Sequence, residues 1–251
     1  TPLYSSAASD VYKRQGLGGL GAIRTEDRDE NVLVLPGDTP LLRPETLKRL
    51  LKTHNENMAA ATILTALVDD PTGYGRIIRD ANGRVLRIVE HKDALPSELE
   101  VREVNTSVYC FRRNLLPDVL EKIVTNNSQG EFYLTDVIEL LQEAGYPVSA
   151  VSVDDPVEAV GVNDQLQLAV CEKEMQERIK RHWSSQGVEI SDWQSCQIDA
   201  NVEIAEGVVL LEGCSIKGNS VFGTGAKIGP DVQIFDSSIG CLLYTSDAAD
   251  E

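Results

Sequence analysis

The chain has 251 residues, a formal net charge of −17 and 25% charged residues. This acidic balance argues against a nucleic-acid-binding surface, which needs clustered lysine and arginine. No apolar run approaches the ~18 residues of a membrane span, so we expect neither nucleic acid nor a membrane as a partner. The five cysteines show no C-x-x-C spacing, which favours free thiols in a reducing, cytoplasmic compartment.

The two ends of the chain match no helix or strand pattern. Residues 5–15 and 241–251 can be back-translated as reverse complements of one another, which is typical of translated sequencing adapter. We therefore interpret residues 1–15 and 241–251 as adapter-like, non-native tails. We expect the natural protein to extend further at both ends.

Asp38 closes the first segment with the composition of a strand. The apolar run 32–35 breaks into Pro36-Gly37 before this carboxylate, which predicts a buried strand that delivers an acid to the carboxyl edge of a sheet, where ligands of open α/β sheets bind. A second apolar stretch ends on Asn163. Carboxylate and amide oxygens suit Mg²⁺, so Asp38 and Asn163 are predicted metal ligands. The alternative is that each caps the helix that follows it.

Between these two residues, strand-like and helix-like segments alternate, which predicts an α/β, Rossmann-like sheet. Residues 76–90 indicate an antiparallel hairpin inserted into this sheet, because Asn82-Gly83 suits its turn. A helix is predicted to begin with residues 44–51 and another to cover 131–145, and further strands are predicted over 61–68, 104–111 and 148–153.

A different pattern starts at Asp164. A polar, glycine-free stretch to about Ser185 predicts a helix of ~20 residues whose thin apolar stripe is typical of a connecting arm. Beyond Cys196 an apolar residue recurs at every sixth position, which predicts the start of a left-handed hexapeptide β-helix, about two coils long. The periodic residues are Ile198, Ile204, Leu210, Ile216, Phe222, Ile228 and Ile234.

Several polar residues inside this framework could bind a ligand, and each has a simpler interpretation. Gly75 would let backbone approach a ligand, or it could merely shape a turn. Glu90 follows a predicted strand in a polar cluster of the kind found more often on a surface than in a site. Asn105 and Thr106 lie early in an apolar strand, where buried polar groups need partners that a sugar hydroxyl would supply.

Three further polar residues are interpreted as surface groups. Arg76 could be a solvated charge on the hairpin, and His54 and His182 fall within predicted helices. The sequence supports no Ser/His/Asp or Cys/His arrangement for nucleophilic catalysis.

Six motifs together resemble the sugar-nucleotide pyrophosphorylase family. With the hexapeptide repeats, they are most similar to its bacterial bifunctional members, which pair a uridylyltransferase with an acetyltransferase. The resemblance covers about residues 17–240. It implies a nucleotidyltransferase domain over 16–163, a linker helix and connector over 164–197, and a truncated β-helix over 198–240. The motifs occupy 35–41, 72–77, 88–94, 104–106, 130–136 and 161–163.

The resemblance also implies roles for individual residues. It makes Asp38 the catalytic group, and it makes Asp38 and Asn163 the ligands of Mg²⁺. The loop 17–22, with Gly18 and Gly19, would meet the uracil base, although the family usually has threonine in place of Gly19. Substrate contacts, chiefly to N-acetylglucosamine, are implied at Pro36, Gly37, Gly75, Glu90, Asn105, Tyr133, Thr135 and Asn163.

The implied reaction is attack by N-acetylglucosamine 1-phosphate on the α-phosphorus of UTP, which releases pyrophosphate and forms UDP-N-acetylglucosamine, a peptidoglycan precursor. The resemblance further implies a homotrimer assembled through the β-helix. The family's opening phosphate-binding loop and its later acetyltransferase coils are absent from residues 16–240, which are therefore expected to be inactive alone. The alternatives are another sugar-1-phosphate nucleotidyltransferase, or a non-catalytic β-helix assembly or regulatory module.

Overall fold

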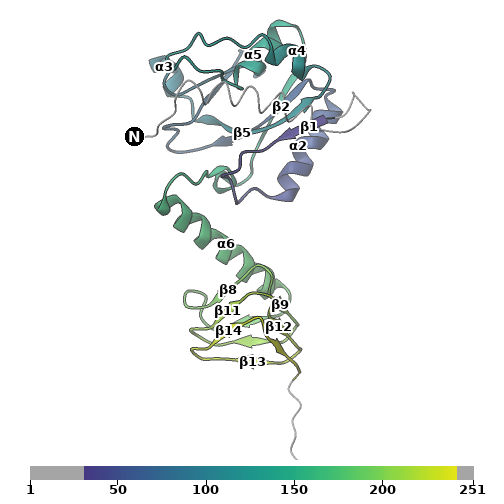
Figure 1. Ribbon diagram of the computed structural model, residues 1–251, viewed down its shortest axis with the longest axis vertical. Helices are drawn as coiled ribbons and strands as arrows, with labels where there is room; N and C mark the ends of the chain where they lie inside the picture. Colours follow the sequence, from purple (N-terminus) through teal and green to yellow (C-terminus); the bar gives the residue numbers. More distant parts are fainter. Residues whose placement is uncertain (1–30, 242–251) are drawn as a thin grey trace, which may run out of the picture. The chain divides into compact units, whose positions relative to one another are not determined.

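The computed structural model describes residues 31–241. Gly18 and Gly19 of the predicted base-binding loop therefore lie outside the described residues. The chain divides into two compact units, Thr1–Gly161 and Val162–Glu251. Figure 1 shows the first as a sheet with helices around it and the second as a helix followed by short stacked strands.

The first unit is built on a six-stranded mixed sheet with the order β4-β3-β5-β2-β6, to which β1 adds by pairing with β5. The long central strand β5 runs antiparallel to β1, β2 and β3, whereas β2 and β6 are parallel. The predicted α/β sheet with an inserted hairpin is confirmed. The strands are β1 (Asn31–Val34), β2 (Ala61–Leu67), β3 (Arg76–Arg79), β4 (Val85–Val89), β5 (Glu103–Arg112) and β6 (Val148–Ser152).

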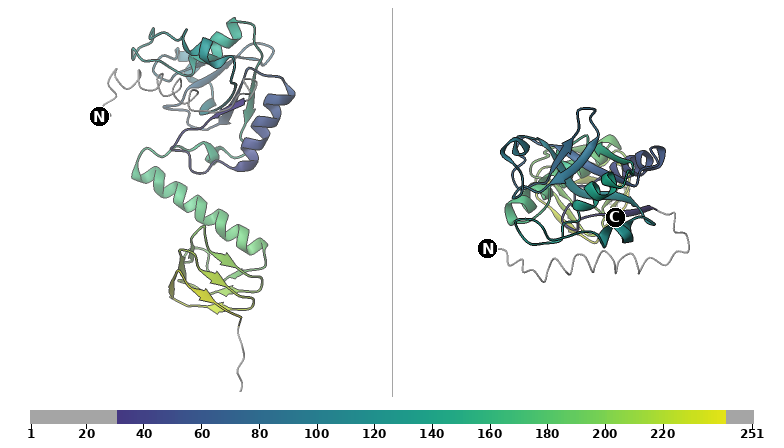
Figure 2. Two further views of the ribbon diagram at one scale, coloured as in Figure 1. Left: turned by 45° about the vertical axis from the view of Figure 1, so that its right-hand side comes forward. Right: turned by 90° about the horizontal axis from the view of Figure 1, so that it is seen from above.

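Helices cover both faces of this sheet, as Figure 2 shows. On one face Leu50 of α2 packs with Leu64 and Val108, and on the other face α4 and α5 pack against Ile63 and Tyr109. Burial of apolar side chains in two separate layers is the main force that holds a sheet between helices. The helical segments are α2 (Pro44–Glu56), α3 (Pro96–Leu99), α4 (Leu116–Leu120), α5 (Asp136–Glu143) and the 3₁₀ helix η1 (Pro156–Ala159).

Two predicted elements differ from the structure. The helix predicted over 131–145 begins only at Asp136, because residues 131–135 form a turn in which the Asp136 amide donates to the Tyr133 carbonyl at 3.2 Å. Strand β1, predicted to be buried, is at most half-buried. Within the described residues β1 pairs with β5 alone, so its other edge has no described strand beside it.

His54, interpreted from the sequence as a surface residue, is buried in α2 at 2% exposure. Its Nδ1 lies 2.9 Å from the Thr62 hydroxyl and its Nε2 lies 3.1 Å from Asn31 Oδ1. The histidine thus joins the helix to both β1 and β2. Burial, and after it the charge of Arg112, lowers the pKa of His54 below its ordinary 6.5.

In the second unit, α6 (Gln165–Ser185) is followed by three parallel sheets of three short strands each. Gln197 pairs with Ser215 and Ser215 with Gln233, a repeat of 18 residues, or three hexapeptides per layer. Figure 1 shows these strands stacked in layers. The sheets comprise β7 (Glu189–Ile190), β10 (Val209–Leu210) and β13 (Lys227–Ile228); β8 (Gln197–Ile198), β11 (Ser215–Lys217) and β14 (Gln233–Phe235); and β9 (Glu203–Ile204), β12 (Val221–Phe222) and β15 (Ser238–Ile239).

The hexapeptide pattern therefore forms the start of a β-helix. Six of the seven periodic side chains are buried in its interior, and Ile234 is half-buried near the last layer. The first layer begins at Glu189, ahead of the predicted residue 198. Glu189 pairs with Val209, twenty residues on, so this strand falls outside the period of six.

Helix α6 is more than a connecting arm, because its second half covers the first layer of the β-helix. The side chain of Gln176 makes two hydrogen bonds to the backbone of Ile198. Its Nε2 donates to the Ile198 carbonyl at 2.9 Å, and its Oε1 accepts from the Ile198 backbone amide at 3.0 Å. The buried Lys180 ammonium donates to the Trp193 carbonyl, and Trp183 packs against the apolar interior. No helix among residues 31–241 has the length and apolar character needed to cross a membrane.

The interior position of the periodic residues gives a first prediction. Phe222→Ala should cost about 3–5 kcal/mol, because it leaves a cavity in a packed interior. Phe235→Ala is the matched control and should stay within about 0.5 kcal/mol, since Phe235 is 67% exposed. Both tryptophans, Trp183 and Trp193, lie in the second unit, so urea unfolding followed by tryptophan fluorescence reports on it. Equal losses in both variants would contradict the interior placement.

The buried His54 gives a second prediction, on pH. Because the folded state lowers the pKa of His54, the unfolded chain takes up a proton first as the pH falls below 6.5, and stability decreases over that range. His54→Gln keeps a hydrogen-bonding side chain and should make the free energy of unfolding less sensitive to pH between 7.5 and 5.5. Denaturation followed by circular dichroism measures this, and an unchanged pH dependence would contradict it.

Candidate functional site

The candidate site lies where one edge of β5 is interrupted. On that edge β1 pairs with residues 109–112 and β3 pairs with Val104, so residues 105–108 have no strand partner there among the described residues. The chain leaves β1 through Pro36, Gly37 and Asp38 on one side of this gap and enters β3 through Gly75 on the other. The topology therefore brings two of the predicted motifs to the same stretch of β5.

A bulge in β5 shapes the floor of the gap. The register with β2 shifts between Ile63 and Thr65, and Ser107 adopts a positive φ of 60°, a left-handed conformation that few residues other than glycine adopt. Thr106 fills the space by donating its hydroxyl to the Leu64 carbonyl at 2.8 Å. Bulges of this kind redirect side chains next to binding sites.

Asn105 and Thr106 are buried as predicted, but both have partners within the protein. Asn105 Nδ2 donates to the Tyr109 hydroxyl at 2.7 Å, and Asn105 Oδ1 accepts from the Ser107 amide at 3.1 Å. A sugar hydroxyl is therefore not needed to explain the burial of Thr106. Asn105 still has one amide hydrogen and one lone pair available, because its amide can make more bonds than these two.

Gly75, Glu90 and Thr135 come together beside Asn105. The Gly75 carbonyl accepts the Asn105 amide at 2.8 Å. A Cβ atom on Gly75 would lie 3.0 Å from Ile88 Cγ2 and 3.5 Å from both Glu90 carboxylate oxygens, so a side chain would crowd the acid. The Thr135 hydroxyl donates to Glu90 Oε1 at 3.1 Å. Residues from four separate motifs thus form one polar cluster.

Electrostatics in this cluster favour hydrogen-bond acceptance over ion pairing. Burial raises the pKa of Glu90. Burial, followed by the charges of Glu139, Glu90 and Asp93, raises the pKa of Asp136 to about 6. Burial and the neighbouring Asp93 also raise the pKa of Tyr133. A neutral, hydroxyl-rich group suits such surroundings, whereas a second anion would be repelled.

Asp38 is exposed, and its carboxylate makes no hydrogen bond or ion pair to any other described residue. Its charge acts on the half-buried Tyr74, whose pKa is raised first by burial and then by Asp38. Pro36 is half-buried and Gly37 is exposed, with open space where a Cβ would stand. As far as the described residues go, this carboxylate is available to bind a cation.

The helix-capping alternatives for the two predicted metal ligands are wrong. Arg43 stands at the N-cap of α2, so Asp38 does not cap it. The Asp164 side chain caps α6 by accepting from the backbone amide of Gln167. The backbone amide of Asn163 donates to Gln167 Oε1 at 2.7 Å. Asn163 is exposed and belongs to the second unit, so its pairing with Asp38 stays a prediction.

A carboxylate and an amide oxygen remain a chemically suitable donor pair for Mg²⁺, which keeps much of its shell for water and phosphate. Among the described residues, no group of three or more histidine, cysteine, aspartate or glutamate side chains could hold a metal ion.

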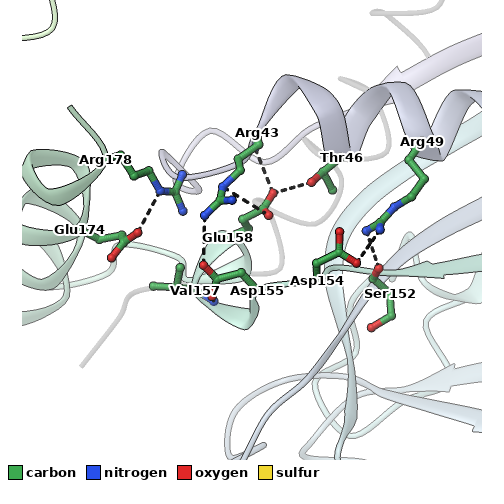
Figure 3. Close-up of polar contacts among 10 residues, drawn as sticks. All are labelled: Arg43, Thr46, Arg49, Ser152, Asp154, Asp155, Val157, Glu158, Glu174 and Arg178. Atoms are coloured by element: carbon green, nitrogen blue, oxygen red, sulfur yellow. Dashed lines mark hydrogen bonds and ion pairs between the residues drawn. The ribbon is translucent and has the colours of Figure 1, made fainter. Parts of the chain in front are cut away.

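A network that sequence reasoning missed fixes the start of α2, the helix that follows Asp38. Glu158, 2% exposed, accepts from the Arg43 amide at 3.1 Å and from the Thr46 hydroxyl at 2.6 Å. Arg43 also pairs with Asp155 at 3.1 Å. Figure 3 shows these contacts, with Arg49 reaching Asp154 farther along the helix. No local sequence signal marks Glu158, because its partners lie over a hundred residues earlier.

Gly75 gives a third prediction, on the shape of the site. Gly75→Ala should lower the stability of the first unit by about 1–2 kcal/mol, because the added methyl overpacks Ile88 and Glu90. Gly37→Ala, which meets open space, should stay within about 0.5 kcal/mol. Urea denaturation followed by circular dichroism compares the two. Equal stability of both variants would show that Gly75 only shapes a turn.

Comparison with known proteins adds to this geometry. The model of the nucleotidyl transferase family matches residues 19–184. The bifunctional protein GlmU of Carboxydothermus hydrogenoformans is 42% identical over 212 residues, which are 84% of this chain and 48% of the relative. GlmU of a Geobacillus species is 46% identical over 92% of this chain and 51% of the relative. GlmU of Lactobacillus delbrueckii is 48% identical over 83% of this chain and 45% of the relative. The chain spans about half the length of these curated relatives.

Proposed function

Because the chain belongs to the nucleotidyl transferase family, we propose that the whole protein transfers a uridylyl group from UTP to N-acetylglucosamine 1-phosphate. The observation that carries this proposal is the cluster of Gly75, Glu90, Asn105 and Thr135 beside the strand end that bears Asp38. Similarity to proteins named bifunctional GlmU supports the choice of substrates.

The polar cluster is suited to hold the sugar. Glu90 and the free lone pair of Asn105 would accept hydrogen bonds from sugar hydroxyls, and the absence of a side chain at Gly75 keeps the Glu90 carboxylate uncrowded. Hydroxyls held by buried acceptors give strong discrimination, because a sugar without them leaves the acceptors unpaired. Pro36, Gly37 and Tyr133 would line the same product, and Gly18 and Gly19 would meet the uracil base.

Asp38 and Asn163 would hold a Mg²⁺ ion through a carboxylate and an amide oxygen. When bound, the ion neutralises phosphate charge and stabilises the charge that develops during transfer. The oxygen of the sugar phosphate then forms a bond to the α-phosphorus of UTP while the bond to the bridging oxygen breaks and pyrophosphate leaves. The attacking phosphate is already ionised near pH 7, so the chain needs no general base.

The β-helix extends the proposal to the whole protein. The whole protein would carry a second, acetyltransferase activity, in line with the word bifunctional in the names of its relatives, and would assemble into a homotrimer through the β-helix. The uridylyl transfer would then supply UDP-N-acetylglucosamine for cell-wall synthesis. A related enzyme for another sugar or base would share Asp38 and the glycines. Competition between UDP-N-acetylglucosamine, dTDP-glucose and GDP-mannose for the protein separates these possibilities.

Asp38 gives a fourth prediction. In the whole protein, Asp38→Ala should reduce kcat by about 10²–10³-fold, because it removes a group that acts where charge develops. The affinity for the sugar phosphate should change much less. Asp118→Ala, which removes another exposed acid, in α4, serves as control. Pyrophosphate release at several Mg²⁺ concentrations measures the effect. Near-normal turnover of Asp38→Ala would overturn its role as a metal ligand.

A further inference from the structure

Arg76 is the most unusual charged residue of the first unit. Its side chain is 1% exposed, although the sequence allowed a solvated charge. Burial lowers the pKa of its guanidinium, and the charge of Asp70 only partly offsets this effect. Among the described residues, no carboxylate lies within ion-pairing distance of Arg76. Burying a cation costs free energy unless it is paired and hydrogen-bonded, so the contacts that Arg76 makes with the described residues are informative.

Among the described residues, the guanidinium of Arg76 contacts one group on each side of the hairpin. One terminal nitrogen donates to the Tyr74 carbonyl, and the other lies 3.2 Å from His91 Nδ1. Tyr74 directly precedes Gly75, and His91 directly follows Glu90. One guanidinium therefore links the residues that flank two members of the polar cluster.

The strand register shows why such a link is needed. The ladder between β3 and β4 ends with the pair Arg76–Val89. Gly75 and Glu90 lie one residue beyond it, where no ladder bond holds the two strands together. Neighbouring residues of a strand face opposite sides of the sheet. Gly75 faces Glu90 on one side of the sheet, so the side chain of Arg76 acts from the other side.

We propose that Arg76 is a positioning residue that clamps the open end of the β3–β4 hairpin and thereby keeps Gly75 and Glu90 opposed for sugar binding. The sugar-binding part rests on the proposed function, whereas the clamp itself does not. Arginine suits this task because its planar fork presents several donors in fixed directions. A lysine ammonium has no such fork.

The clamp fixes a property of His91 that can be observed directly. A guanidinium can only donate hydrogen bonds, so Nδ1 of His91 must accept and its proton must reside on Nε2. The chain has only three histidines, so His91→Gln assigns the resonance. Glutamine can accept through its side-chain oxygen in place of Nδ1, which makes His91→Gln the conservative variant and His91→Leu the disruptive one.

The test uses the isotopically labelled chain and begins with nuclear magnetic resonance of the His91 ring. In the wild type we expect a single tautomer with the proton on Nε2, and in Arg76→Met we expect exchange between tautomers. Methionine keeps apolar volume and removes a buried charge, a change that often leaves stability unaltered or raised. A proton on Nδ1 of His91 in the wild type would overturn the clamp. The same single His91 tautomer in Arg76→Met as in the wild type would also overturn it.

Amide hydrogen exchange tests positioning apart from general stability. The backbone amide of Asn105 donates to the Gly75 carbonyl at 2.8 Å. The hydrogen of this backbone amide should therefore exchange faster in Arg76→Met and His91→Leu but not in His91→Gln. The Phe111 amide, farther along β5, should keep its protection in all of them. Equal acceleration at both amides would show a merely structural role for Arg76 and would overturn the proposal.

Binding of N-acetylglucosamine 1-phosphate to the same variants completes the test. Arg76→Met and His91→Leu should bind about tenfold or more weakly, in the range typical of lost supporting contacts, while His91→Gln stays close to the wild type. Wild-type affinity in Arg76→Met would overturn the positioning role. Absence of binding to the wild-type chain would count against the proposed substrate, while the ring and exchange measurements would still decide the clamp.

Discussion

The first unit depends on the interruption of strand β5. This strand pairs with β2 along one edge. On its other edge, the pairing with β1 ends at Tyr109 of β5 and the pairing with β3 is at Val104 of β5. A continuous ladder would have filled the gap with backbone hydrogen bonds and left no room for a ligand. The bulge at Ser107 and the side-chain bonds of Asn105 and Thr106 satisfy the interrupted strand from within. The binding cluster can therefore form without leaving these buried polar groups unpaired.

The charges around this gap divide the site into two parts with different chemistry. Asp93 and Asp136 lie near Glu90 of the polar cluster. Burial first, and then the charges of Glu139, Glu90 and Asp93, raises the pKa of Asp136 to about 6. Acidic surroundings of this kind suit hydroxyls and disfavour phosphate. The phosphates of the proposed substrates would then lie toward Asp38, where a bound cation offsets their charge. A cation bound at Asp38 would help to make the acidic overall composition of the chain compatible with anionic substrates.

Much of the framework could be predicted from the sequence because its signals are local. The strand run before Asp38, the Asn82-Gly83 turn and the hexapeptide period each reside in consecutive residues, and all three elements form. The signals fail where distant residues decide. The turn at 131–135 replaces the start of α5 so that Thr135 can meet Glu90. His54 and Arg76 carry no sequence mark of burial, because their partners come from other segments. Strand β7 departs from the period of six.

If the interrupted edge of β5 forms a sugar-nucleotide site, the nucleotide sugar should bind there. Titration of the ¹⁵N-labelled chain with UDP-N-acetylglucosamine and Mg²⁺, followed by amide chemical shifts, locates the bound ligand. We expect saturable shifts at Gly75, Glu90, Asn105 and Thr135, and none in the β-helix core around Ile216. Shifts confined to the second unit, or equal shifts with GDP-mannose, would contradict it.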